Sequence, residues 1–315
     1  MNESVLLLTV VSAIAVGTPI LLAGLGEILT EQSGVMNLGI EGMMLVGGVA
    51  GFWASTEVAS LPLAFAVGMI AGALMGLIHA FFAVTLRVNQ IVSGLALVIA
   101  GTGISSFIGS LNDGSLFGSR SITSLDPVLS GAITDLPIVG PLIFGHDWVV
   151  YLSWVLVGAA SFWLFRTKNG LALRAVGEDP PTADAAGISV ATTRYIYTLV
   201  GGAGAGFGGA YLTIGVFGIW QNGITAGIGW IAVALVIFAG WRPWRALVAA
   251  YIFGVLRNLS FTLQIMGVDV PSDLLNALPF ILTIVALIII SARPVSARKF
   301  SGPSALAVPY SRESR

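Results

Sequence analysis

Residues 62 to 86, PLAFAVGMIAGALMGLIHAFFAVTL, contain no Asp, Glu, Lys or Arg. The hydrocarbon core of a bilayer is about 30 Å thick, so an α-helix needs roughly 20 apolar residues to cross it. Backbone polar groups inside lipid must find partners within the protein, and a helix satisfies them all within one segment. This stretch therefore predicts a transmembrane helix.

The same length criterion is met by seven uninterrupted apolar stretches, which are residues 5 to 25, 62 to 86, 90 to 110, 147 to 165, 195 to 217, 246 to 266 and 274 to 292. Two shorter stretches, 42 to 56 and 228 to 241, are flanked by Gly-rich polar sequence. They can span only where the bilayer thins or a half-helix continues them. The sequence predicts an all-α polytopic membrane protein with about nine transmembrane helices, within a range of eight to ten. This transmembrane domain covers residues 1–292, and residues 293–315 form a tail.

The composition excludes several classes of function. Of the 315 residues, 56% are hydrophobic and only 9% are charged, against about 25% charged in soluble proteins, so a soluble enzyme is excluded. The net charge of -1 offers no positive surplus for nucleic acid. The two lysines, Lys168 and Lys299, do not follow a phosphate-binding glycine loop, so the chain has no ATPase of its own. Neither His79 nor His146 has a carboxylate at metal-ligand spacing, and we expect no metal and no bound cofactor.

The basic residues predict the orientation, because short loops rich in Lys and Arg stay in the cytoplasm. With nine spans, twelve of the fourteen basic residues fall on one face: Arg87, Arg166, Lys168, Arg174, Arg194, Arg242, Arg245, Arg293, Arg298, Lys299, Arg312 and Arg315. This face is predicted to be cytoplasmic, with the C-terminus on it and the N-terminus outside.

Residues 26 to 42, GEILTEQSGVMNLGIEG, interrupt the apolar pattern with three carboxylates and Asn37. The segment has no Lys or Arg, and its apolar residues recur too often for a solvated loop. Irregular backbone at membrane depth occurs where it lines a cavity. We favour a discontinuous second helix lining a pathway, with Asn37 and Glu41 on it, over a plain cytoplasmic loop.

Residues 222 to 230, NGITAGIGW, echo that segment in the second half of the chain and also open a short span. The predicted topology gives the two short spans opposite directions. Short, Gly-interrupted spans in oppositely oriented halves are typical of inverted-repeat transporters that bind solute near the midplane. The match needs a one-residue gap, so the inverted-repeat character and a pathway role for Thr225 are suggestions only.

Two further polar features are pathway candidates. Asn89, Gln90 and Ser93 lie at the cytoplasmic mouth of the fourth span, where capping the helix is an equally good interpretation. Arg257 lies near the middle of a span, and a charge at that depth must face the bundle interior or water. The hypothesis is that Arg257 pairs with a buried carboxylate such as Glu41.

Capping residues predict a short helix in the cytoplasmic loop 166–194. Asp179 is a good N-cap, Pro180 suits the first helical position, and Gly187 suits a left-handed C-cap, which predicts a two-turn helix at 180–186. So short a helix needs a surface to hold it. A docking element is favoured over an inert connector.

Here the sequence resembles a family. RAVGEDP at 174–180 and ADAAGI at 183–188 are similar to the coupling-loop signature of permease subunits in bacterial ABC importers of the ribose and branched-chain amino acid permease superfamily. Residues 26–42 resemble the N-terminal signature of its nucleoside and simple-sugar subgroup, and the tail around Pro303–Leu306 and Pro309–Tyr310 is similar too. In FAGWRP at 238–243, Ala239 replaces a subgroup glycine, which leaves open how that turn packs.

The resemblance implies a bacterial plasma (inner) membrane location and a division of labour. A second permease subunit, in a heterodimer, completes the path, an extracytoplasmic binding protein delivers a small polar solute, and cytoplasmic ATP-binding subunits use the ATP. It implies that the ATPase contact is made by the signature residues Glu178, Asp179, Asp184, Ala185, Ala186 and Gly187. Nucleosides, purine nucleosides first, are the implied substrates, with simple sugars second.

The residues alone do not show whether the transported solute is ribose or a nucleoside. An ion-coupled secondary transporter stays open as a rival, because Glu27, Glu31 and Glu41 could carry a proton. An intramembrane enzyme is the third reading, although the sequence offers no convincing nucleophile and base pair.

Overall fold

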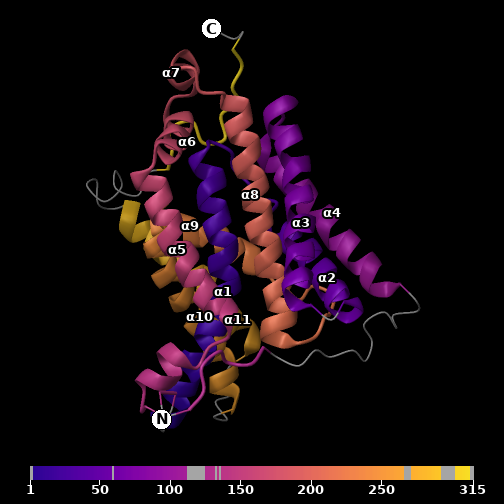
Figure 1. The fold of residues 1–315 in the computed structure, drawn as a ribbon, viewed down its shortest axis with the longest axis vertical. Coiled ribbons are helices and arrows are strands. Elements are labelled where there is room, and N and C mark those ends of the chain that lie inside the picture. Colours follow the sequence, from indigo (N-terminus) through magenta and orange to yellow (C-terminus); the bar gives the residue numbers. More distant parts are fainter. Residues whose placement is uncertain are drawn as a thin grey trace.

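A computed structural model describes residues 3–58, 60–111, 125–131, 133–134, 136–265, 271–291 and 302–312. This part of the chain forms helices and no strands (Figure 1). The helices are α1 (Glu3–Gln32), α2 (Ile40–Glu57), α3 (Leu61–Ala80), α4 (Gln90–Ser110), α5 (Trp148–Arg166), α6 (Lys168–Glu178), α7 (Pro180–Ala185), α8 (Val190–Tyr211), α9 (Ile228–Ala239), α10 (Pro243–Ile265) and α11 (Ser272–Ser291). Three π-helical turns accompany them, η1 (Phe81–Thr85), η2 (Gly140–Phe144) and η3 (Leu212–Phe217).

Each of the nine predicted apolar stretches falls on a helix. Among the described residues, five helices are long and apolar enough to cross a membrane: Leu7–Gln32, Leu61–Thr85, Gln90–Ser110, Trp148–Arg166 and Val190–Phe217. The remaining predicted spans fall on α2, α9, α10 and α11. The structure confirms an all-helical protein with several spans, while the count of nine stays a prediction.

Glycines bring α8 into direct backbone contact with three helices (Figure 1). A Cβ on Gly72 of α3 would lie 2.2 Å from the carbonyl oxygen of Gly202 in α8, and one on Gly47 of α2 would lie 2.3 Å from Cα of Gly206. On another side of α8, a Cβ on Gly208 would lie 2.6 Å from the carbonyl oxygen of Pro19 in α1. Small residues permit such close approach between helices in lipid, so the glycines of α8 are packing residues.

The first interrupted segment differs from the predicted discontinuous helix. α1 continues unbroken through Glu27 and Glu31 to Gln32, and the interruption is a turn at 33–39 before α2 begins. The helix continues because both carboxylates find hydrogen-bond donors inside the bundle. It stops before Gly34, which has a φ of +87°. The turn is not a solvated loop either, because Asn37 at its centre is fully buried.

The two chain ends lie at opposite ends of the bundle (Figure 1). α6 and α7 stand at the end where the C-terminus lies, together with the last turn of α1 and the start of α8. Residues 302–312 run back along this end and contact α6, α7 and α8.

Candidate translocation and coupling sites

The two interrupted segments meet at the carboxylate of Glu41, in the first turn of α2. Its Oε1 accepts hydrogen bonds from the Thr225 hydroxyl (2.6 Å) and from the backbone N–H of Gly227 (3.0 Å). Its Oε2 accepts from the N–H of Gly229 (2.6 Å). The first N–H groups of α9 have no partner within that helix and carry a partial positive charge, so a carboxylate there is favourable. Glu41 thus caps α9 from another helix.

This junction lies deep in the bundle. The backbone of Gly42 contacts Gly101, which stands near the middle of α4. From the junction, α9 runs toward the end of the bundle where α1 ends, because Trp241 after α9 donates from Nε1 to Glu31 (2.6 Å). α2 lies in the half remote from α7 (Figure 1). Two short helices therefore start near mid-depth and lead to opposite ends, while the inverted-repeat relation itself stays a prediction.

Arg257 does not form the direct pair with Glu41 that the sequence suggested. Within the described residues, no hydrogen bond or ion pair joins the two side chains. The carboxylate is already engaged by donors of the 225–229 turn, which sequence reasoning did not link to it. Arg257 stays a pathway candidate as a partly buried side chain of α10.

A second polar cluster holds the turn between α1 and α2. Glu27 accepts hydrogen bonds from Asn37, at 3.0 Å from the side-chain Nδ2 and at 3.3 Å from the backbone N–H. The Oδ1 of Asn37 accepts in turn from the N–H of Gly39 (3.1 Å), at the start of α2. The candidate Asn37 therefore builds the turn and connects α1 with α2.

The neighbouring helices α3 and α4 also hold this turn. The N–H of Met36 donates to Oε1 of Gln90 (2.7 Å). His79 of α3 lies 3.0 Å from the carbonyl oxygen of Met36 through Nε2, and 3.2 Å from the Ser93 hydroxyl through Nδ1. The structure thus brings Gln90 and Ser93 together around the turn. Sequence reasoning weighed His79 only as a metal ligand and missed this role.

Asn89 caps α4, as the alternative interpretation of this residue proposed. Its side chain accepts from the N–H groups of Ile91 (3.0 Å) and Val92 (3.2 Å), at the start of α4. Asn89 and Ser93 also line an apolar groove of about 570 Å³ between α3 and α4. The buried amide Nε2 of Gln90 has no hydrogen-bond partner. This amide is a spare donor close to the turn.

The predicted short helix is present as α7. Asp179 caps it by accepting from the N–H of Thr182 (3.2 Å) and from the Thr182 hydroxyl. These hydrogen bonds lower the pKa of Asp179 below its usual value. Gly187 has a φ of +84°, and Ile188 donates its N–H to the carbonyl oxygen of Ala183 (3.0 Å). Both predicted caps are confirmed, and the helix ends one residue earlier than predicted.

α7 has a buried face and an exposed face. Ala183 is buried in a small apolar cluster with Val176 of α6, Val190 of α8 and Tyr310 of the tail. The exposed residues are Pro181, Thr182, Ala185, Ala186 and Gly187. The candidates Ala185, Ala186 and Gly187 therefore face away from the protein, where a partner can reach them.

Glu178 and Asp184, two of the three remaining coupling candidates, face the tail. Glu178 accepts hydrogen bonds from the hydroxyl (2.7 Å) and N–H (3.3 Å) of Ser304. Asp184 accepts from the Tyr310 hydroxyl (3.0 Å) and forms an ion pair of 2.8 Å with Arg312. The tail thus fastens α7 to the bundle. No local sequence signal joins residues this far apart in the chain, so sequence reasoning missed the contact.

Comparisons with known proteins agree with this architecture. The family model described as the permease component of branched-chain amino acid transport systems matches residues 9–287. A Haloferax volcanii protein that carries the provisional name of a glucose ABC transporter permease is 39% identical, over 96% of this chain and 97% of the relative. A guanosine ABC transporter permease protein of Bacillus subtilis is 33% identical, over 97% of each chain. A second guanosine permease protein of that organism is 26% identical, over 87% of this chain and 79% of the relative.

A solved structure shares the fold. It shows the inward-facing conformation of a provisionally assigned metal-chelate type ABC transporter, with a TM-score of 0.50, 16% sequence identity, and coverage of 89% of this chain and 84% of the other. The family match and the relatives both span most of the chain, including α7 and the segments that meet at Glu41. The chain is a multi-pass membrane protein and belongs to the family of permease components of branched-chain amino acid transport systems.

Proposed function

We propose that this chain is the permease subunit of an ATP-driven importer and that it forms part of the path for a nucleoside, with purine nucleosides first. The observation that carries the proposal is α7, a doubly capped helix with an exposed outer face in a chain that has no phosphate-binding loop. Such a helix is a contact for a separate ATPase, and family membership supports this partner.

The substrate class rests on the relatives and on the polar groups of the interior. One relative is named for guanosine and another for glucose, so a simple sugar is the alternative. Inside the bundle, the carboxylates of Glu27 and Glu41 are already engaged by donors. Amides and hydroxyls, among them the spare amide of Gln90, are the neutral polar groups that the described interior offers a solute. These groups suit neutral hydroxyl-bearing solutes.

The path is proposed to pass the junction of α2 and α9. Solute sites in transporters form where half-helices meet near the bilayer centre. Glu41 and Thr225 form the junction. The candidates Asn37, Gln90 and Ser93 surround the turn between α1 and α2, and Asn89 caps α4. Arg257 of α10 is proposed to face the same path. In this arrangement Glu41 fixes the geometry and Arg257 supplies a charge beside the path.

The proposed partners are a second permease subunit, an extracytoplasmic binding protein and cytoplasmic ATP-binding subunits. Two different guanosine permease proteins of one organism resemble this chain, which supports a heterodimer of two permease subunits. An extracytoplasmic binding protein would deliver the solute at the end that carries the N-terminus. The α7 end, where Arg87, Arg194 and Arg312 gather, would face the cytoplasm. ATP binding on the partner subunits would shift the permease pair between inward- and outward-open states.

The test is uptake into liposomes that contain the complete complex, with ATP enclosed and the binding protein outside. We expect labelled guanosine to accumulate only when ATP and both partner proteins are present. Unlabelled inosine should compete with it and ribose should not. Accumulation of sugar instead would favour the alternative, and uptake by this chain alone under an ion gradient would overturn the proposal.

A further inference from the structure

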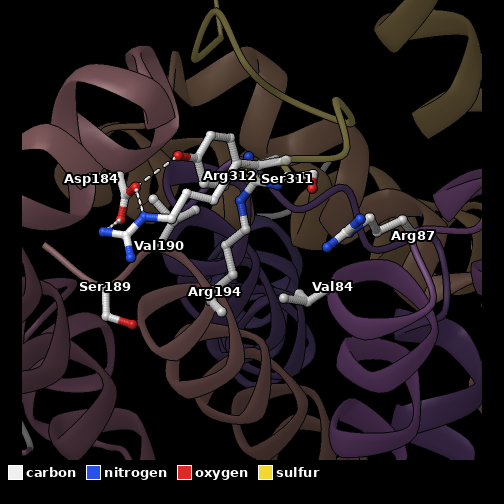
Figure 2. A pocket seen from close by; sticks show the side chains of 10 residues that line it. Val84, Arg87, Asp184, Ser189, Val190, Arg194, Ser311 and Arg312 are labelled. Carbon is white, nitrogen blue, oxygen red and sulfur yellow. Dashed lines mark hydrogen bonds and ion pairs between the residues drawn. The ribbon is translucent and has the colours of Figure 1, made fainter. Parts of the chain in front are cut away.

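A small cavity of about 230 Å³ lies at the α7 end of the bundle (Figure 2). It is open to one side and is lined by η1 and the turn after it, by the connection between α7 and α8, and by the tail. Polar side chains supply much of its wall: Arg87, Asp184, Ser189, Arg194, Ser311 and Arg312. None of these was assigned to solute transport above, and the cavity is separate from the junction at Glu41.

Arg194 carries a buried positive charge into the wall of this cavity. Its side chain is only 1% exposed. Nε donates to the carbonyl oxygen of Ser33 (3.2 Å) and one terminal nitrogen donates to that of Val308 (3.0 Å), while the other terminal nitrogen has no partner. In the described part of the chain, no carboxylate forms an ion pair with it. A buried cation without a counter-charge is costly, and an anion in the cavity would offset that cost.

Arg87 adds a second positive charge, for which no ion pair is found within the described residues. It lies in the turn between η1 and α4, and Figure 2 shows its guanidinium directed toward the side on which Arg194 lies. Arg312 is the third cation, but its bidentate pairing with Asp184 cancels both charges. Among the described lining residues, two positive charges, the buried one of Arg194 and the exposed one of Arg87, therefore have no carboxylate partner in an ion pair.

We propose that this cavity binds a phosphate group. The exposed guanidinium of Arg87 matches phosphate oxygens in geometry and charge, whereas Arg194, whose unpartnered nitrogen is buried against Gly34, attracts the anion without contacting it. Because Asp184 belongs to α7 and Arg312 to the tail, a bound phosphate would connect the α3–α4 turn with the unit that carries α7. The phosphate can come from a soluble cytoplasmic ion or ester, or from the headgroup of an anionic lipid.

The first experimental arm measures the soluble source on the intact transporter complex in detergent. The midpoint temperature of unfolding is followed while sodium phosphate replaces sodium chloride at constant ionic strength. We expect phosphate to raise the midpoint of the wild type. In Arg87→Gln the concentration for half the effect should rise at least tenfold. Arg166→Gln, an exposed arginine at the end of α5 outside the cavity, is the matched control and should respond like the wild type. Phosphate binding by the ATPase subunits is common to all three proteins and cancels in the comparison.

The second arm measures the lipid source. The same three complexes are prepared with phosphatidylglycerol and phosphatidylcholine, and native mass spectrometry counts the retained lipids. If the wild type and Arg166→Gln retain phosphatidylglycerol and Arg87→Gln does not, the site is supported and its ligand is a lipid headgroup. If Arg87→Gln matches the wild type in both arms, or if the wild type responds in neither, the proposal is overturned. Neither arm depends on which solute the complex transports, so failure here leaves the proposed function intact.

Discussion

The carboxylate of Glu41 and the hydroxyl of Thr225, 184 positions apart in the sequence, are joined by a hydrogen bond of 2.6 Å. Together with the N–H groups of Gly227 and Gly229, this bond makes Glu41 the cap of α9. A single side chain therefore joins the start of α2 to the start of α9 by three hydrogen bonds.

The first prediction concerns this cap. Glu41→Gln keeps one acceptor oxygen but places an amide N–H₂ where the second accepted a hydrogen bond. A lost hydrogen bond to a charged group costs about 1.5–3 kcal/mol, so we expect a lower unfolding midpoint and at least a tenfold loss of uptake. Asp126→Asn, which neutralises an exposed carboxylate outside the helices, is the control and should change neither quantity. Wild-type stability of Glu41→Gln would contradict the capping role.

The second prediction reverses the charge of Arg257. Arg257→Glu would put a carboxylate at a partly buried position of α10 in a bundle that already buries the carboxylates of Glu27, Glu31 and Glu41. Like charges repel strongly in a low-dielectric interior, and we expect loss of complex assembly or of uptake. Arg257→Lys keeps the charge and should retain most activity. Size-exclusion chromatography and liposome uptake measure the two outcomes, and a fully active Arg257→Glu variant would show that this charge has no role.

Local signals in the sequence were sufficient to predict several of the helices. The apolar run of 62–86 forms α3 and η1. In lipid the backbone N–H and C=O groups must be hydrogen-bonded within the protein, and a helix does this within one segment. Likewise Asp179 and Gly187 set the ends of α7, because capping depends on residues only a few positions apart. The continuation of α1 through Glu27 was not predictable in this way, since it depends on a donor from Asn37 across a turn.

The contacts that define the candidate sites are non-local. Nothing near Glu178 or Asp184 indicates that Ser304 and Tyr310 will bind them. Arg194 was one basic residue among twelve on its face, and its burial follows from tail residues more than a hundred positions later. Pairings of this kind depend on how the helices assemble, whereas hydrophobic periodicity reports only the local helix.

The third prediction tests the glycine contacts. Gly47→Ala places a methyl group 2.3 Å from Cα of Gly206, where only backbone atoms could move away. Overpacking of this kind costs about 1–3 kcal/mol, and we expect a clearly lower unfolding midpoint. In the control Gly158→Ala, on α5, the new Cβ meets nothing within 4 Å, and better helix propensity should leave stability unchanged or raised. Equal midpoints for the two variants would refute the packing role.

The fourth prediction concerns the tail. The N–H of Ala305 donates to the carbonyl oxygen of Gly177 (2.9 Å), next to α7. Ala305→Pro removes this donor, so we expect faster amide hydrogen exchange in residues 303–310 and fewer solute molecules imported per ATP. Ala305→Ser keeps the N–H and serves as the control. Unchanged exchange in the proline variant would mean that the tail is held by other contacts.

The last prediction addresses α7 as the coupling element. Gly187 has a φ of +84° and donates its N–H to the carbonyl oxygen of Asp184 (3.0 Å). Proline fixes φ near −65° and has no N–H, so Gly187→Pro cannot end the helix in this way. Because no other atom lies within 4 Å of a Cβ at this position, the damage should stay local. We expect normal membrane insertion and ATP hydrolysis without matching uptake, whereas Gly187→Asn, which tolerates a left-handed backbone, should keep the two coupled. If Gly187→Pro still couples ATP hydrolysis to uptake, the C-terminal end of α7 is not needed for coupling, and α7 is not the coupling element.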